Sequence, residues 1–184
     1  NVAEDPSTEE HLLRGTLAHA FFEAIGRGMD AEKAKLLVME AFERIQDVPQ
    51  WQLRFKLDEF SALLDRAREW ARQSEVNQEL AGVEIPVGVH VSEGVRIGGY
   101  MDRLLRDKEG NYLVVDLKTG RSTPAKKEGE EHVQLMAYQL ALSRGAFDGH
   151  QVHDGEGMPR KGGVLVYPGT TTQKIGEIWQ SDKS

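Results

Sequence analysis

The sequence predicts a mixed α/β (α+β) fold, in which a small mixed β-sheet is flanked by helices and preceded by a helical region. Three observations favour this fold. Residues 7–70 carry apolar side chains at helical spacing, residues 83–118 alternate as strands do, and another helical stretch and a short apolar run follow. With 184 residues, the chain predicts one domain, with a helical region at 1–80 and a sheet-containing core at 81–184.

Within the helical region at 1–80, the sequence predicts three helices. Apolar residues recur at helical spacing over 12–25, and two glycines follow that can end the first helix. Asp30 can cap a second helix, whose apolar stripe covers 34–45. Pro49 then interrupts the chain, and a third helix carries its stripe over 53–70.

The second region predicts strands. The segments Val83–Val91, Val95–Arg106 and Tyr112–Lys118 are rich in β-branched or alternating residues, and Asp107–Asn111 is a good hairpin connection between the last two strands.

Beyond the third strand, the sequence predicts a helix, a loop and a last strand. The helix covers Thr123–Arg144, the polar and glycine-rich loop covers 146–162, and the strand covers Gly163–Tyr167. The first residue, Asn1, is not an initiator methionine. We expect a domain from a longer chain, although a trimmed tag would look the same.

Composition excludes several kinds of protein. The chain has no cysteine, which excludes disulfides, thiolate zinc sites, iron–sulfur clusters and cysteine nucleophiles. No apolar run approaches the roughly 18 residues that a membrane span needs, so we expect no membrane partner and a cytoplasmic protein.

The net charge of −7 weighs against a nucleic-acid partner without excluding it. Residues 1–80 hold 16 acidic and 10 basic residues, whereas residues 81–184 hold 14 and 13. The second region is therefore nearly neutral, and some of its acids are candidate metal ligands.

The segment around Asp116 carries the strongest chemical signal. On a strand, Asp116 and Lys118 share one face, while their neighbours point to the other. Antiparallel pairing across the hairpin can bring Asp102 close to Asp116. Two converging carboxylates suit Mg²⁺ or Mn²⁺, and a nearby lysine can orient water and stabilise charge on a phosphate. An isolated Asp-x-Lys is more often a surface salt bridge, so the flanking residues decide between the two interpretations.

Four motifs follow one another along the chain: Gly15-Thr16-x-x-His19-x-x-x-Glu23, Gly-Gly-Tyr-Met-Asp-Arg at 98–103, Val-Val-Asp-Leu-Lys-Thr-Gly at 114–120, and Gln134-x-x-x-Tyr138. Their order and their helix and strand contexts resemble RecB-like nucleases of the PD-(D/E)XK superfamily, which occur at the C-terminus of helicase–nuclease proteins. The resemblance covers about two thirds of the chain and implies a restriction-endonuclease-like core.

The resemblance implies a role for each motif residue. Asp102 and Asp116 match the metal-binding carboxylates, and Lys118 matches the catalytic lysine. The carbonyl of Leu117 matches a backbone metal ligand, and His19 matches a histidine near the metal, so we expect His19 to supplement the metal ligands. The helix pair that lines the active-site groove is matched by Gln134 and Tyr138.

Taken alone, several of these residues have ordinary interpretations. His19 is more often a packed or exposed histidine than a ligand, and Gln134 and Tyr138 are more often partly buried helix residues. Glu84 is a candidate to support the metal ligands from the preceding strand. Candidate phosphate contacts, which could equally be solvated charges, are Arg103, Arg106, Arg121, Lys126 and Lys127.

The predicted function is a Mg²⁺- or Mn²⁺-dependent DNA exonuclease that hydrolyses phosphodiester bonds in end resection and recombinational repair. By analogy, a helicase region in the same polypeptide, or a partner helicase subunit, supplies the DNA. The alternative is a catalytically inactive module that binds DNA or acts as a scaffold in a helicase complex. Some relatives carry an iron–sulfur cluster, which this cysteine-free chain cannot hold.

Overall fold

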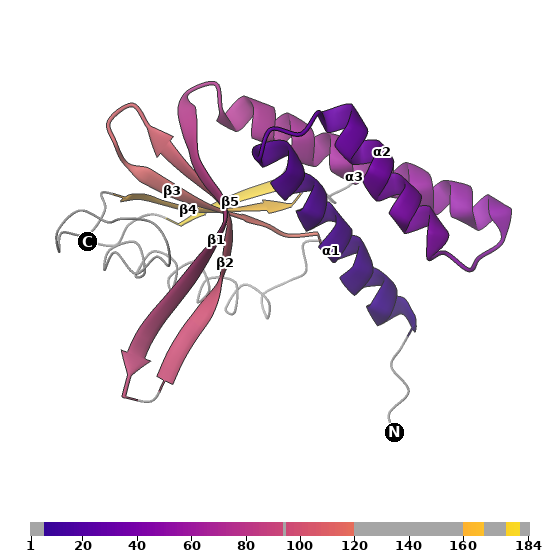
Figure 1. Cartoon of the computed structure of the whole chain (residues 1–184), viewed down its shortest axis with the longest axis horizontal. Coiled ribbons are helices and arrows are strands. Elements are labelled where there is room, and N and C mark those ends of the chain that lie inside the picture. The colour runs from indigo at the N-terminus through magenta and orange to yellow at the C-terminus, as the bar shows by residue number, and fades with distance from the viewer. Residues whose placement is uncertain (1–5, 94, 120–159, 168–175, 181–184) are drawn as a thin grey trace.

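The computed structural model describes residues 6–93, 95–119, 160–167 and 176–180. The elements within these ranges are α1 (Pro6–Gly26), α2 (Ala31–Arg44), α3 (Gln50–Ser74), β1 (Gln78–Ser92), β2 (Val95–Asp107), β3 (Tyr112–Leu117), β4 (Arg160–Tyr167) and β5 (Gly176–Gln180). Figure 1 shows the three helices packed together beside the sheet. The predicted mixed fold with a helical N-terminal region is confirmed.

The helix boundaries follow the local signals in the sequence. Asp30 caps α2, since its Oδ1 accepts a hydrogen bond of 2.9 Å from the backbone N–H of Lys33. Pro49 precedes α3, and its carbonyl accepts the backbone N–H of Leu53 at 2.9 Å. All three predicted helices are therefore confirmed.

The sheet has the order β1-β2-β3-β4-β5 within the described residues. The pair β3–β4 is parallel and the other neighbouring pairs are antiparallel, so the sheet is mixed, as predicted. β4 begins three residues before the predicted Gly163, and β5 was not predicted. The predicted helix Thr123–Arg144 and most of the predicted loop lie outside the described residues.

The first two strands extend well beyond the third. β1 and β2 have 15 and 13 residues, whereas β3 has 6, and the β1–β2 pair projects from the sheet as a two-stranded ribbon (Figure 1). β1 begins at Gln78 and not at the predicted Val83, because a bulge between Leu80 and Gly82 interrupts the alternation that the sequence shows. The sheet therefore begins inside the predicted helical region.

Two apolar clusters join the helices to each other and to the sheet. In the first, Phe22 of α1 and Trp70 of α3 pack against the buried face of β2 and β3, which includes Val115. In the second, α1, α2 and α3 pack together, and the rings of Phe42 and Phe60 stack with centroids 4.3 Å apart. Burying each of these aromatic side chains contributes about 2–3 kcal/mol. The helices thus hold one face of the sheet in place.

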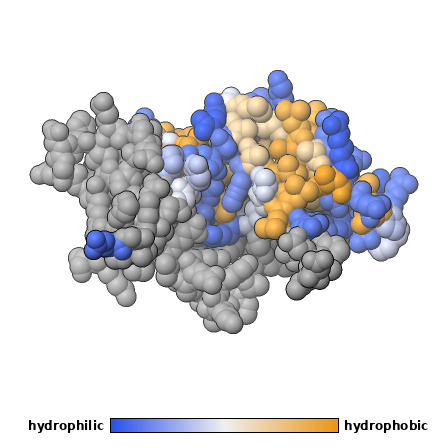
Figure 2. Space-filling view, turned by 60° about the horizontal axis from the view of Figure 1, so that its bottom comes forward, coloured by the Kyte–Doolittle hydropathy of each residue, from blue (hydrophilic) through white to orange (hydrophobic). Residues whose placement is uncertain are grey.

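The helical part also exposes large apolar side chains. Leu12, Trp51 and Phe55 are exposed, and Figure 2 shows apolar surface gathered over the helical side of the molecule. None of the helices in the described ranges combines the length and apolar composition needed to cross a bilayer.

Candidate active site

Strands β2 and β3 bring the two predicted metal-binding carboxylates together. Their antiparallel register pairs Arg103 with Val115 and Leu104 with Val114, and one further step places Asp102 opposite Asp116. Both aspartates are buried, with 7 % and 4 % of their surface exposed. The predicted convergence across the hairpin is confirmed.

The backbone and the neighbouring acid set the charge state of Asp102. Its Oδ2 accepts a hydrogen bond of 2.7 Å from the backbone N–H of Leu117. Burial, followed by a hydrogen bond with Asp116 and the negative charge of Asp116, raises the pKa of Asp102 to about 9. At neutral pH this raised pKa favours the protonated form of Asp102 in the metal-free protein.

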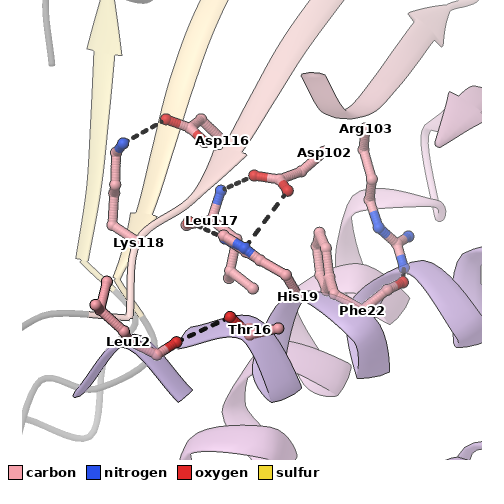
Figure 3. A network of polar contacts seen from close by, with 9 residues as sticks. All are labelled: Leu12, Thr16, His19, Phe22, Asp102, Arg103, Asp116, Leu117 and Lys118. Carbon is pink, nitrogen blue, oxygen red and sulfur yellow. Dashed lines mark hydrogen bonds and ion pairs between the residues drawn. The ribbon is translucent and has the colours of Figure 1, made fainter. Parts of the chain in front are cut away.

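Asp116 of β3 and Lys118, which directly follows the strand, point toward each other, as predicted (Figure 3). Lys118 Nζ lies 2.9 Å from Asp116 Oδ2, which is the distance of an ion pair. Apart from this ion pair, the buried Oδ2 accepts no hydrogen bond within the described residues. A buried carboxylate oxygen in this state can accept a further positive ligand.

His19 reaches the site from α1. Its Nε2 lies 2.9 Å from the carbonyl oxygen of Leu117, and since a carbonyl only accepts, Nε2 carries the hydrogen. Burial is the largest cause that lowers the pKa of His19, so the ring is neutral at pH 7 and its Nδ1 is bare. Nδ1 lies 3.8 Å from Asp102 Oδ1 (Figure 3). His19 therefore donates a hydrogen bond to one predicted metal ligand, the Leu117 carbonyl, and lies beside a second, Asp102.

α1 also contacts the chain just after β3. Arg14 Nη2 donates a hydrogen bond of 3.2 Å to the carbonyl of Thr119. A methyl group at Gly15 would lie 3.0 Å from Thr119 Oγ1, so α1 approaches this segment closely. The sequence singled out Gly15 and His19 but not Arg14. The only signal for Arg14 is its position directly before that motif.

The prediction that Arg103 contacts phosphate is wrong. Arg103 is 1 % exposed, and its Nη2 donates a hydrogen bond of 2.9 Å to the carbonyl of Phe22. Its guanidinium lies 3.9 Å from the centre of the Phe22 ring, and Nη1 lies 3.3 Å from Glu75 Oε1. Alternation along β2 gives the reason, because Arg103 and Asp102 point to opposite faces and Arg103 faces the helices (Figure 3).

The other predicted residues lie elsewhere. Arg106 is exposed, with its guanidinium 5.8 Å from the centre of the Tyr112 ring. It lies four residues from Asp102 along β2, roughly 13 Å at ordinary strand rise, so the structure does not bring it into the site. Five predicted site residues lie outside the described residues: Gln134, Tyr138, Arg121, Lys126 and Lys127.

Glu84 reaches the site from β1, as expected. Burial, followed by the negative charge of Glu23, raises the pKa of Glu84, and a hydrogen bond joins its side chain to Asp102. Its φ of 46° is the one positive value at a non-glycine position among the described residues. Such a backbone costs about 1–3 kcal/mol and is concentrated at functional sites. Three strands thus contribute a carboxyl group to the same place.

The donor set fits a hard divalent cation. Within the described ranges, no three histidine, aspartate or glutamate side chains form a ready-made metal cluster. Mg²⁺, however, is commonly held by one or two carboxylates, with water and substrate phosphates completing the shell. Asp102, Asp116 and the Leu117 carbonyl supply that kind of set. Lys118 Nζ supplies one positive charge beside Asp116, yet the pKa of Asp102 stays raised, and a cation bound to the pair could replace its proton.

Comparison with known proteins identifies the family. A sequence profile described as the PD-(D/E)XK nuclease superfamily matches residues 1–180. No curated protein matches this chain. Among solved structures, the crystal structure of SSO0001 resembles the chain with a TM-score of 0.40 and 16 % sequence identity, over 90 % of this chain and 66 % of that one. The helices and mixed sheet are consistent with a PD-(D/E)XK-like core. Because the profile covers almost the whole sequence, the chain belongs to the PD-(D/E)XK nuclease superfamily.

Proposed function

We propose that this chain is a Mg²⁺- or Mn²⁺-dependent deoxyribonuclease of the RecB-like type, which hydrolyses phosphodiester bonds in DNA. One observation carries the proposal. Two buried carboxyl groups, Asp102 and Asp116, meet on adjacent strands, and Lys118 Nζ lies 2.9 Å from the second of them. Membership of a nuclease superfamily supports the same chemistry.

Each residue of the site has a separate role in the proposed hydrolysis. Asp102, Asp116 and the Leu117 carbonyl would hold the cation, whose charge stabilises the phosphate and activates water. Lys118, with 24 % of its side chain exposed, is accessible to substrate and would contact the attacking water or a phosphate oxygen. His19 would keep the Leu117 carbonyl in place through its Nε2–H group.

The wider role belongs to the same proposal. The RecB-like motif order supports an exonuclease that acts in end resection and recombinational repair, with DNA delivered by a helicase region of the same polypeptide or by a partner subunit. Gln134 and Tyr138 would line the groove. Arg121, Lys126 and Lys127 are the candidate phosphate contacts closest to the site in sequence.

Gel analysis of end-labelled DNA tests the proposal. Single- and double-stranded substrates, labelled at either the 5′ or the 3′ end, are incubated with Mn²⁺, with Mg²⁺ or with EDTA. We expect cleavage that requires the metal, and the labelled products report polarity and exonuclease action. Binding of DNA without any cleavage in either metal would contradict the enzyme and support the inactive DNA-binding or scaffolding module.

A further inference from the structure

Arg14 lies beside the site and has no role in the proposed reaction. Its side chain is 15 % exposed, and it connects two parts of the molecule. Nη2 donates a hydrogen bond of 3.2 Å to the carbonyl of Thr119, and Nη1 lies 3.5 Å from Glu59 Oε1 on α3. Nε is buried and meets no hydrogen-bond acceptor in the part of the chain that the structure describes. A largely buried guanidinium with an unsatisfied donor is costly to the folded state, so Arg14 is a candidate for a role beyond stability.

Lys118 directly follows Leu117, the last residue of β3 that pairs with a neighbouring strand. β3 ends at Leu117, whose partner on β4 is Val166, and the pairing with β2 ends earlier, at Val115. Sheet pairing therefore fixes Asp116 but not the direction in which the backbone continues through Lys118 and beyond. Contacts from α1 can supply that direction.

Two hydrogen bonds from α1 bracket Lys118. His19 binds the carbonyl of the residue before it, and Arg14 binds the carbonyl of the residue after it. The close approach of Gly15 to Thr119 Oγ1 fits the same contact, because a larger residue there would press on the segment. Arg14 is also tied to α3, so the segment is held against the packed helices.

We propose that Arg14 is a positioning residue of the nuclease site, which fixes Lys118 by anchoring the Thr119 carbonyl to α1 and α3. This inference rests on the proposed function. The guanidinium suits the task because its rigid fork reaches two acceptors at once, whereas a lysine ammonium at position 14 would serve one of them.

Kinetics of DNA cleavage in Mn²⁺ compare Arg14→Ala, Arg14→Lys and the matched control Glu59→Gln, which weakens the ion pair but leaves the Thr119 bond. We expect kcat to fall about 10-fold to 100-fold in Arg14→Ala with little change in KM, since small misplacements of catalytic groups cost that much. Arg14→Lys, which keeps the charge, should show a smaller loss, and so should Glu59→Gln, which weakens only the tie to α3. An unchanged kcat in both Arg14 variants, or an equal loss in Glu59→Gln, would overturn the inference.

Chemical rescue gives a sharper readout. Guanidinium chloride at about 20–50 mM, matched with NaCl, should restore part of the kcat of Arg14→Ala and leave wild type unchanged, because the free ion can occupy the vacated site. A merely structural role predicts no rescue. If Arg14→Ala does not fold, the kcat of Arg14→Lys decides the question.

A measurement without metal or DNA separates this inference from the proposed function. Hydrogen exchange of the metal-free protein should be faster at the Lys118 and Thr119 amides in Arg14→Ala and Arg14→Lys, and less affected in Glu59→Gln, which keeps the Thr119 bond. Equal exchange in wild type and both Arg14 variants would overturn the positioning role. If wild type does not cleave DNA, the proposed function fails, and the exchange rates still decide whether Arg14 holds this segment.

Discussion

At the scale of single residues, the site is defined by carboxyl groups that the strands place close together. Asp102 keeps a proton because burial and the neighbouring Asp116 penalise its ionised form. A divalent cation would remove that penalty by replacing the proton. If the site binds a metal as proposed, metal binding and proton release would therefore be coupled.

The first prediction concerns Asp102→Asn in the metal-free protein. The folded pKa of Asp102 is raised from 3.8 to about 9, so the native state keeps a proton that the unfolded chain releases between these values. This contribution to stability is complete below the lower value and is lost as pH rises toward the upper one. In EDTA, the melting temperature of wild type should therefore fall between about pH 5 and about pH 8 more steeply than that of Asp102→Asn.

Mn²⁺ should act differently on wild type and on Asp102→Asn. It should raise the melting temperature of wild type, and more at about pH 8 than at about pH 6, because binding competes with the proton on Asp102. Asp102→Asn should gain little, since it lacks one ligand charge. Equal stabilisation of both proteins by Mn²⁺, measured by thermal melting, would remove Asp102 from the metal ligands.

At the scale of elements, the structure depends on how closely α1 approaches the strands. The helix ends at Gly26, where a methyl group would lie 2.5 Å from Val83 Cγ1 and 3.3 Å from Arg103 Nη2. The absence of a side chain at this position therefore lets α1 reach β1 and the buried guanidinium together.

Gly26→Ala should destabilise the fold by about 1–3 kcal/mol, because an added methyl group overpacks this contact. Val83→Ala removes the nearest atom, so the double variant should lose less than the sum of the two single changes. Urea unfolding of the four proteins measures this coupling. Strictly additive losses would show that the two residues do not press on each other.

Most of the helices and strands could be predicted from the sequence. Periodicity located the three helices and β2, β3 and β4, and the hairpin register brought Asp102 to Asp116. The start of β1 was misplaced because the bulge near Gly82 breaks the alternation. β5 was not predicted because its two apolar residues, Ile178 and Trp179, are adjacent, so they neither alternate nor form an apolar run.

Side-chain roles were harder to predict than elements. The prediction for Arg103 considered its charge but not the face of β2 to which it points. Alternation along the strand turns this side chain toward the helices. The contact of Arg14 with Thr119 joins residues 105 positions apart, and no local pattern reports such a distance. Roles that depend on long-range contacts therefore need the structure.

At the scale of the whole molecule, charge sets an expectation for DNA binding. The chain carries a net charge of −7, and Arg103 is no longer available as a phosphate contact. Of the five basic residues predicted to contact phosphate, Arg106, Arg121, Lys126 and Lys127 remain. Weak binding by the isolated chain follows, and a partner that delivers the strand would compensate for it.

Fluorescence anisotropy with a labelled single-stranded oligonucleotide, in Ca²⁺ in place of Mn²⁺, measures that binding. With three or four phosphates contacted, log affinity should fall against log salt with a slope of about −2 to −3. A steep slope with nanomolar affinity at roughly 150 mM salt would reveal a basic groove that these residues do not provide.

The nuclease assignment depends most on Asp116 and Lys118, and one comparison tests it directly. Asp116→Ala and Lys118→Ala are assayed beside wild type for Mn²⁺-dependent cleavage of end-labelled DNA, with circular dichroism as the control for folding. We expect each variant to lose cleavage while its spectrum stays unchanged, because Asp116 would bind the cation and Lys118 would contact the reacting groups. Cleavage by either folded variant at near the wild-type rate would contradict the assignment of this site.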